Sequence, residues 1–178
     1  EAFDAAIRAM DGAAARRWLG ECGTGRAATA LKVLAAGALG DPATVPWLIQ
    51  RMEQTDHAKA AGEAFALLTG ADLEYLDLDG AAPSDAPKGP SDNPSDPRTA
   101  LDADEDLPWP DPGAVAGWWE EIRATLPTGP LFLGRASTSE AWCVGLAEGY
   151  QRQRRAAALH IALADPVAPL PTWRTRCD

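Results

Sequence analysis

The sequence has few of the side chains that usually carry catalysis or bind metal: two histidines and three cysteines in 178 residues. No two of them stand at metal-ligand spacing. No His-Glu metal motif, phosphate-binding glycine loop or nucleophile elbow is present. A dyad of Cys143 with His57 or His160 is the one nucleophilic alternative, and no spacing in the chain joins these residues. We therefore predict that the protein is not an enzyme and has no cofactor or metal.

The cysteine pattern and the lack of a long apolar run restrict the cellular compartment. An odd, scattered set of cysteines favours reduced thiols over a disulfide framework. No apolar run reaches the roughly 20 residues that cross a bilayer, and no signal peptide is visible. The chain begins at Glu1 rather than at Met, so the missing signal excludes little. We expect a cytoplasmic protein without membrane contact, in which Cys143 is a small buried side chain of an apolar helix.

The net charge of −10 is concentrated in one segment. Residues 72–111 hold twelve acidic and two basic side chains, and seven of the fifteen prolines. Within them, residues 83–98 have no apolar period, and such a composition cannot bury enough surface to offset the entropy of ordering. We predict a long acidic insertion that is mobile at its centre. Apolar residues should hold its two ends in place: Leu73, Tyr75, Leu76 and Leu78 at the first, Leu107, Pro108, Trp109 and Pro110 at the second.

The flanks of this segment have the periodicity of helices. The phrase Asp-Pro-x-x-Val occurs at Asp41 and at Asp111, where aspartate caps a helix and proline takes its first position. We expect Pro46 to bend the helix near its start. The predicted helices are 5–10, 13–19, 26–39, 41–52, 57–68, 115–126, 137–147 and 151–163, with one short extended stretch in 127–134. The predicted core-facing residues are Ala27, Ala30, Leu31, Leu34, Ala38, Val45, Leu48, Ile49, Met52, Ala61, Ala64, Phe65 and Leu68.

The repeated helix start indicates stacked helix pairs. Without the insertion, the two Asp-Pro starts are separated by roughly 35 to 40 residues, which is the period of two-helix solenoid repeats. Small residues in the inner helices would let neighbouring layers approach closely. We predict an all-α, HEAT-like solenoid with helical repeats in 1–71, the acidic insertion in 72–111, further helices in 112–164 and a proline-rich tail in 165–178. The alternative is an ordinary helical bundle with two coincidental Asp-Pro caps.

Several strings resemble an uncharacterised bacterial HEAT-like repeat family. The stretch 40–49 is similar to the first helix of such a repeat, as in phycobilin-lyase-type arrays. Leu-Pro-Trp-Pro-Asp-Pro at 107–112 and Arg-Gln-Arg-Arg at 152–155 are more unusual, and the resemblance covers about 26–173. It implies a chain that is the C-terminal portion of a longer repeat protein. Genes of this family often lie near type VI secretion components, which implies effector handling or immunity.

The acidic run and the tryptophans are the predicted partner-binding residues. The acidic run is either a solvated loop or a polyanionic surface for a basic partner, and its fragments of a calcium loop lack the turn glycine and distal glutamate. Of two adjacent tryptophans on one helix, one should be buried and the other partly exposed as an interface residue. The full predicted set is Asp102, Asp104, Glu105, Asp106, Trp109, Trp118 and Trp119.

Three arginines near the C-terminus allow two interpretations. Arg152, Arg154 and Arg155 could form a nucleic-acid patch, but three residues are a small footprint and the acidic segment would repel phosphate. The other interpretation is internal, with the acidic loop lying near these arginines and neutralising them. We expect no nucleic-acid binding.

The functional prediction is a protein-binding scaffold, because stacked helix pairs expose an extended curved surface. Together with the resemblance, this favours a cytoplasmic immunity or effector-handling protein of type VI secretion, whose partner is a protein such as a basic secreted effector or toxin. The alternative is a purely structural repeat module of a longer protein whose activity lies upstream.

Overall fold

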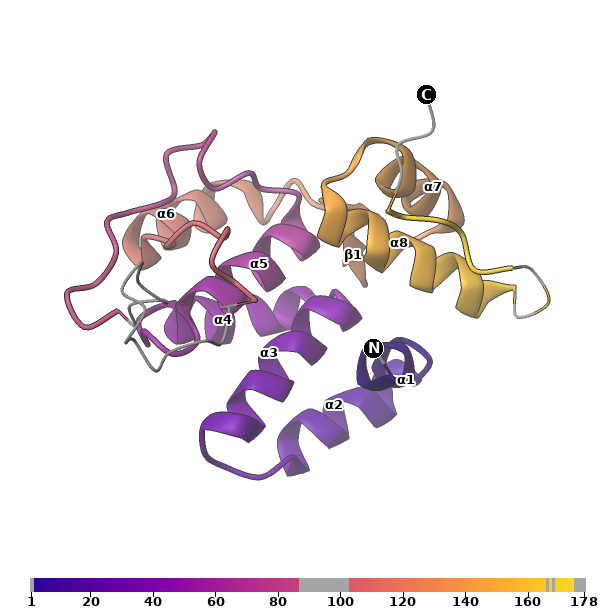
Figure 1. The fold of residues 1–178 in the computed structure, drawn as a ribbon, viewed down its shortest axis with the longest axis horizontal. Helices are drawn as coiled ribbons and strands as arrows, with labels where there is room; N and C mark the ends of the chain where they lie inside the picture. The colour runs from indigo at the N-terminus through magenta and orange to yellow at the C-terminus, as the bar shows by residue number, and fades with distance from the viewer. Residues whose placement is uncertain (1, 87–102, 166, 168, 175–178) are drawn as a thin grey trace, which may run out of the picture.

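The protein is described by a computed structural model that covers residues 2–86, 103–165, 167 and 169–174. This part of the chain is mostly helical, as predicted, and its one sheet is a small hairpin (Figure 1). None of its helices is long and apolar enough to cross a bilayer. The elements in order are α1 Ala2–Arg8, α2 Gly12–Glu21, α3 Arg26–Leu39, a 3₁₀ turn Pro42–Thr44, α4 Val45–Met52, α5 Ala58–Thr69, α6 Pro112–Ile122, β1 Leu131–Phe132, β2 Arg135–Ala136, α7 Ser139–Glu148 and α8 Gln151–Ala164.

Both Asp-Pro phrases cap a helical element, as predicted. Asp111 Oδ1 accepts hydrogen bonds from two backbone N–H groups at the start of α6, at 2.8 and 3.0 Å. Asp41 Oδ1 accepts one from the Ala43 N–H at 3.0 Å. After Asp41, however, a 3₁₀ turn precedes α4, and Pro46 falls in the first turn of that helix. Proline is tolerated there because the first N–H groups of a helix have no partner within it, so the predicted bend of a continuous helix is wrong.

Helix α5 lies at the centre of the core. Ala61, Ala64, Phe65 and Leu68 are buried, as predicted. This helix packs against α3 and α4, and α4 in turn packs against α6. The rings of Trp118 and Trp119 meet the ring of Phe65 edge-on, with centroids 5.8 and 6.3 Å away. Two helices on either side of the 72–111 segment are therefore joined through one aromatic cluster.

The predicted core face of α3 is confirmed at Ala38, which is buried, but it is wrong at both leucines. Leu31 and Leu34 are 38% and 57% exposed, whereas Val33, Ala35 and Ala36 are buried. The reason is close packing with α5: a Cβ added at Gly37 would lie 3.0 Å from the Cβ of Ala64. Because α3 is apolar on most of its circumference, its periodicity alone does not choose a face, and the small residues take the contact.

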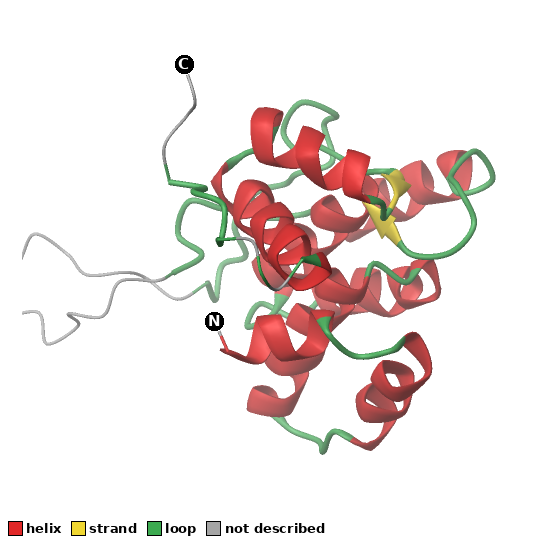
Figure 2. Ribbon diagram, turned by 90° about the vertical axis from the view of Figure 1, so that its right-hand side faces the viewer, coloured by secondary structure: helices red, strands yellow, loops and turns green. Residues whose placement is uncertain are grey.

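The hairpin joins the first five helices to the last two. Leu131 pairs with Ala136 across β1 and β2. The Leu131 N–H donates to the Gly40 carbonyl at 2.8 Å, and the Leu133 N–H donates to the Leu67 carbonyl at 2.9 Å. Figure 2 shows the hairpin in yellow, with helices above and below it. Two glycines that end helices, Gly40 and Gly70, have φ of 64° and 75°, as expected for left-handed caps.

Helix α7 differs from the prediction at two positions. The predicted helix starts at residue 137, whereas the N-cap of α7 is Thr138. Ser137 instead accepts a hydrogen bond from Trp142 Nε1 at 2.9 Å. Cys143 is exposed rather than buried. Because Ala141 and Gly145 are the buried positions of this helix, Cys143, two residues from each, lies on the opposite side.

Packing between helices does not follow chain order alone. Helix α7 packs on α8, and α1 packs on α3, but α1 also packs on α8, the last helix described. In an open array each repeat contacts only its neighbours. The mostly helical class is confirmed. This packing does not confirm the stacked helix pairs, which stay a prediction. The division into 1–71, 72–111, 112–164 and 165–178 also stays a prediction. Most of the predicted mobile centre, 83–98, lies outside the described residues from position 87 onward.

Candidate functional site

The two described ends of the 72–111 segment lie side by side. Asp79 and Pro110 form an isolated antiparallel bridge. Next to it the Gly80 N–H donates to the Trp109 carbonyl, and the Asp111 N–H donates to the Leu78 carbonyl, both at 2.8 Å. Leu73 and Leu78 are buried beside the core, as expected. Tyr75, predicted to help hold this end in place, is instead 84% exposed.

Residues 103–109, here called the acidic strap, are held on the protein by two cations. Arg152 of α8 binds Asp104 Oδ1 at 2.8 Å and Asp106 Oδ1 at 3.2 Å, and also donates to the Ala103 carbonyl. Lys59 of α5 donates to the carbonyls of Asp104 and Glu105 at 2.9 and 3.2 Å. The internal interpretation of the acidic run is therefore confirmed at Arg152. Two predicted partner-binding acids already have an intramolecular counter-charge.

The remaining predicted site residues are distributed differently. Asp102 lies outside the described residues. Glu105 is exposed. Trp109 is half-buried beneath the Lys59 ammonium, which lies 5.1 Å from its ring centroid. Trp119 is buried and Trp118 half-buried, as expected for adjacent helix positions.

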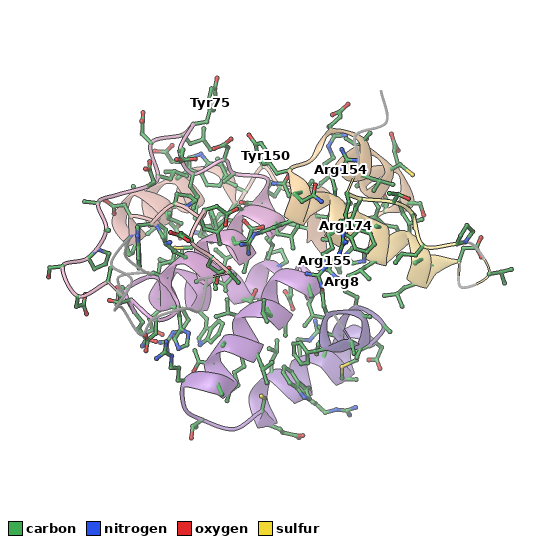
Figure 3. The ribbon with its side chains drawn as sticks, viewed as in Figure 1. Arg8, Tyr75, Tyr150, Arg154, Arg155 and Arg174 are labelled. Carbon is green, nitrogen blue, oxygen red and sulfur yellow. The ribbon has the colours of Figure 1, made fainter. Side chains whose placement is uncertain are left out.

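The most exposed aromatic side chains of this region are two tyrosines that the prediction did not include. Tyr75 is 84% exposed and Tyr150 is 67% exposed, and both lie along one edge of the molecule (Figure 3). Tyr150 O–H donates to Asp72 Oδ2 at 2.8 Å, which links the start of α8 to the start of the 72–111 segment. The sequence places Tyr150 directly after Gly149, at the start of α8. No local pattern in the sequence predicts that Tyr150 lies beside Asp72.

A groove of about 310 Å³ lies between these elements. Its lining includes Glu63 of α5, Asp72 and Glu74, Asp106 of the acidic strap, and Arg152 of α8. Apolar contacts come from Leu73, Leu107 and Pro108. Hydrogen bonds from the Tyr75 N–H and the Tyr150 hydroxyl lower the pKa of Asp72. Burial raises the pKa of Glu63, even though Arg152 opposes this effect.

The three arginines of α8 do not form a common basic surface. Arg152 is paired with the acidic strap. Arg154 is only 5% exposed. Arg155 lies 3.9 Å from Asp4 of α1, and Asp4 also binds the buried Arg8 at 2.8 Å. In Figure 3, Arg8 and Arg155 lie together where α1 meets α8.

His160, also at the junction of α1 and α8, is occupied by structural contacts. Its ring stacks on Trp142 with centroids 4.9 Å apart and meets Phe132 edge-on. Arg8 Nη1 lies 2.6 Å from His160 Nε2. Because a guanidinium is always a donor, this imidazole nitrogen is the acceptor and the ring is neutral. Burial, with a smaller effect of Arg8, lowers the pKa of His160 from 6.5 to about 3.

This histidine should make stability depend on pH. In the unfolded chain it takes up a proton below about pH 6.5, whereas the folded protein resists protonation down to about pH 3. The stabilisation is present above the unfolded value and is lost as pH falls toward the folded one. Between pH 7 and pH 5 we expect the free energy of unfolding to fall by about 2 kcal/mol more in the natural protein than in His160→Gln.

Urea denaturation at the two pH values measures this difference. Glutamine is the matched variant because its amide oxygen accepts from Arg8 but does not titrate. Equal losses in the two proteins would contradict a neutral His160 in the folded protein.

Within the described part of the chain, no group of three or more His, Cys, Asp or Glu side chains gathers as a metal site would require. Comparisons with protein-family models, with curated proteins and with solved structures find no match for this chain. The resemblance to a HEAT-like family therefore stays a prediction from the residues.

Proposed function

We propose that this protein is a non-enzymatic, protein-binding scaffold that handles or neutralises a secreted effector of a bacterial type VI secretion system. The family resemblance supports the link to secretion and the cytoplasmic location. The HEAT-like pairing of helices belongs to the same proposal. The packing of α4 on α5 after an Asp-Pro start supports it.

The observation that carries the proposal is the pair of exposed tyrosines, Tyr75 and Tyr150. Tyrosine is enriched at the energetic centres of protein interfaces, because its ring supplies a large contact area with little loss of side-chain freedom. Two such rings on one edge, both beside the groove-lining loop, are unusual for a surface that only meets water. This edge, rather than the tryptophans, is the proposed contact surface.

The charge around the tyrosines indicates the sign of the partner. Glu74, Asp77 and Asp79 are exposed in the same loop as Tyr75, and Glu105 and Asp106 are exposed in the acidic strap. A surface with one sign of charge speeds the encounter with an oppositely charged partner and makes binding sensitive to salt. A basic effector or toxin is the partner that fits.

The test is calorimetric titration of the purified protein with purified effectors encoded beside its gene. We expect one of them to bind, and Tyr75→Ala with Tyr150→Ala to lower its affinity at least about 100-fold, since interface hot spots contribute about 2 kcal/mol or more each. Leu34→Ala is the matched control, because Leu34 is an exposed apolar residue of α3, outside this edge. An affinity unchanged by the double substitution would contradict the proposal.

A further inference from the structure

Glu63 is the groove-lining acid whose surroundings most disfavour a charged carboxylate. It is half-buried, and within the described part of the chain its carboxylate makes no hydrogen bond or ion pair. Burying a carboxylate without a partner is unfavourable. Glu63 lines the groove, and its oxygens are not among the fully buried side-chain atoms that have no hydrogen-bond partner.

Arg152, the arginine that lines the groove, does not pair directly with Glu63. Arg152 attracts Glu63 electrostatically, but its guanidinium nitrogens are already bound to Asp104, Asp106 and the Ala103 carbonyl. The acids of the strap also act on Glu63, and they disfavour its ionised form. Four carboxylates line the groove against this one arginine, namely Glu63, Asp72, Glu74 and Asp106.

From this charge complementarity we infer that the groove receives an arginine or lysine side chain of the bound polypeptide, with Glu63 as its counter-charge. The inference rests on the proposed function and specifies the chemistry of the partner at one position. Leu73, Leu107 and Pro108 would cover the aliphatic stem, as apolar surfaces do for long basic side chains. Tyr150, which lines the groove and is 67% exposed, would contact the neighbouring backbone.

The test uses a small probe, so that it does not depend on finding the effector. The probe is Nα-acetyl-arginine amide, titrated into the ¹⁵N-labelled full chain and followed by NMR. The neutral citrulline analogue, which has the same shape without the charge, is the matched ligand. We expect the arginine probe to shift the amide signals of Gly62, Glu63 and Gln153, and to lower the pKa of Glu63 read from its ¹³C carboxyl signal. The citrulline analogue should do neither.

Two variants complete the experiment. Glu63→Gln should weaken binding of the arginine probe at least tenfold, and its folding is checked by the melting temperature. Glu121→Gln removes one exposed charge from α6 and should leave binding unchanged. Binding of both probes alike, or equal binding to the Glu63→Gln protein, would overturn the inference.

The outcome is separable from that of the proposed function. If the probe fails while the tyrosine substitutions still abolish effector binding, the groove assignment is wrong and the scaffold function stands. If the probe binds at Glu63 but no neighbouring effector binds the protein, the groove assignment stands and the effector proposal is wrong.

Discussion

Replacing Gly40 by alanine should destabilise the protein by about 3 kcal/mol, because two unfavourable effects act at one position. Gly40 has a φ of 64°, a left-handed conformation that alanine adopts only with strain. A Cβ there would also overlap the carbonyl oxygen of Leu131 in β1. The Leu131 N–H donates to the Gly40 carbonyl at 2.8 Å, so the two backbones cannot separate without breaking this bond. Urea denaturation would give the loss of unfolding free energy.

Gly129→Ala is the matched control for Gly40→Ala. Gly129 has a φ of 91° but open space where a Cβ would stand. It should therefore show the conformational strain alone, which is about 1 kcal/mol. Equal losses in the two variants would mean that the end of α3 does not approach β1 closely.

Phe65→Ala should have the other large effect, a loss of about 3 to 5 kcal/mol in unfolding free energy. Phe65 is fully buried in the central helix α5, and its ring contacts the two tryptophans of α6. Truncation removes the apolar contact and leaves a cavity that the surrounding helices fill only in part. Loss of near-ultraviolet circular dichroism from the tryptophans, together with a lower melting temperature, would report it.

Tyr75→Ala is the control for Phe65→Ala, since it truncates an aromatic ring that is 84% exposed. Surface substitutions of this kind usually change stability by less than about 0.5 kcal/mol. The two variants should thus separate: Phe65→Ala lowers the free energy of unfolding, whereas Tyr75→Ala leaves it nearly unchanged. A large loss of stability in Tyr75→Ala would show that this side chain packs on the protein.

Much of the local structure could be predicted from the residues. Helix α3 has the predicted bounds, and the start of α8 was placed at the correct residue. Asp41 and Asp111 cap as expected, because a cap depends on a side chain and N–H groups only two or three residues away. The buried side of α5 also follows from its own period, with Phe65 at its centre.

The candidate site was predicted less well, because its contacts join residues far apart in the chain. Asp104 and Asp106 were predicted to bind a partner, but Arg152 of α8 binds them, as the internal interpretation of the arginines had it. The hydroxyl of the exposed Tyr150 donates a hydrogen bond to Asp72, which is 78 positions away in the sequence. Neither contact leaves a trace in local spacing.

The helical class, the caps at Asp41 and Asp111 and the concentration of acidic charge in one segment are thus already determined by the order of residues, since a cap forms through hydrogen bonds within a few positions. Which face of α3 is buried, where Cys143 points and what neutralises the acidic strap depend on how distant helices pack. An apolar helix offers several faces of similar free energy, and the close fit of Gly37 against Ala64 selects one of them. That selection requires the assembled molecule, because the partner surface does not exist before folding.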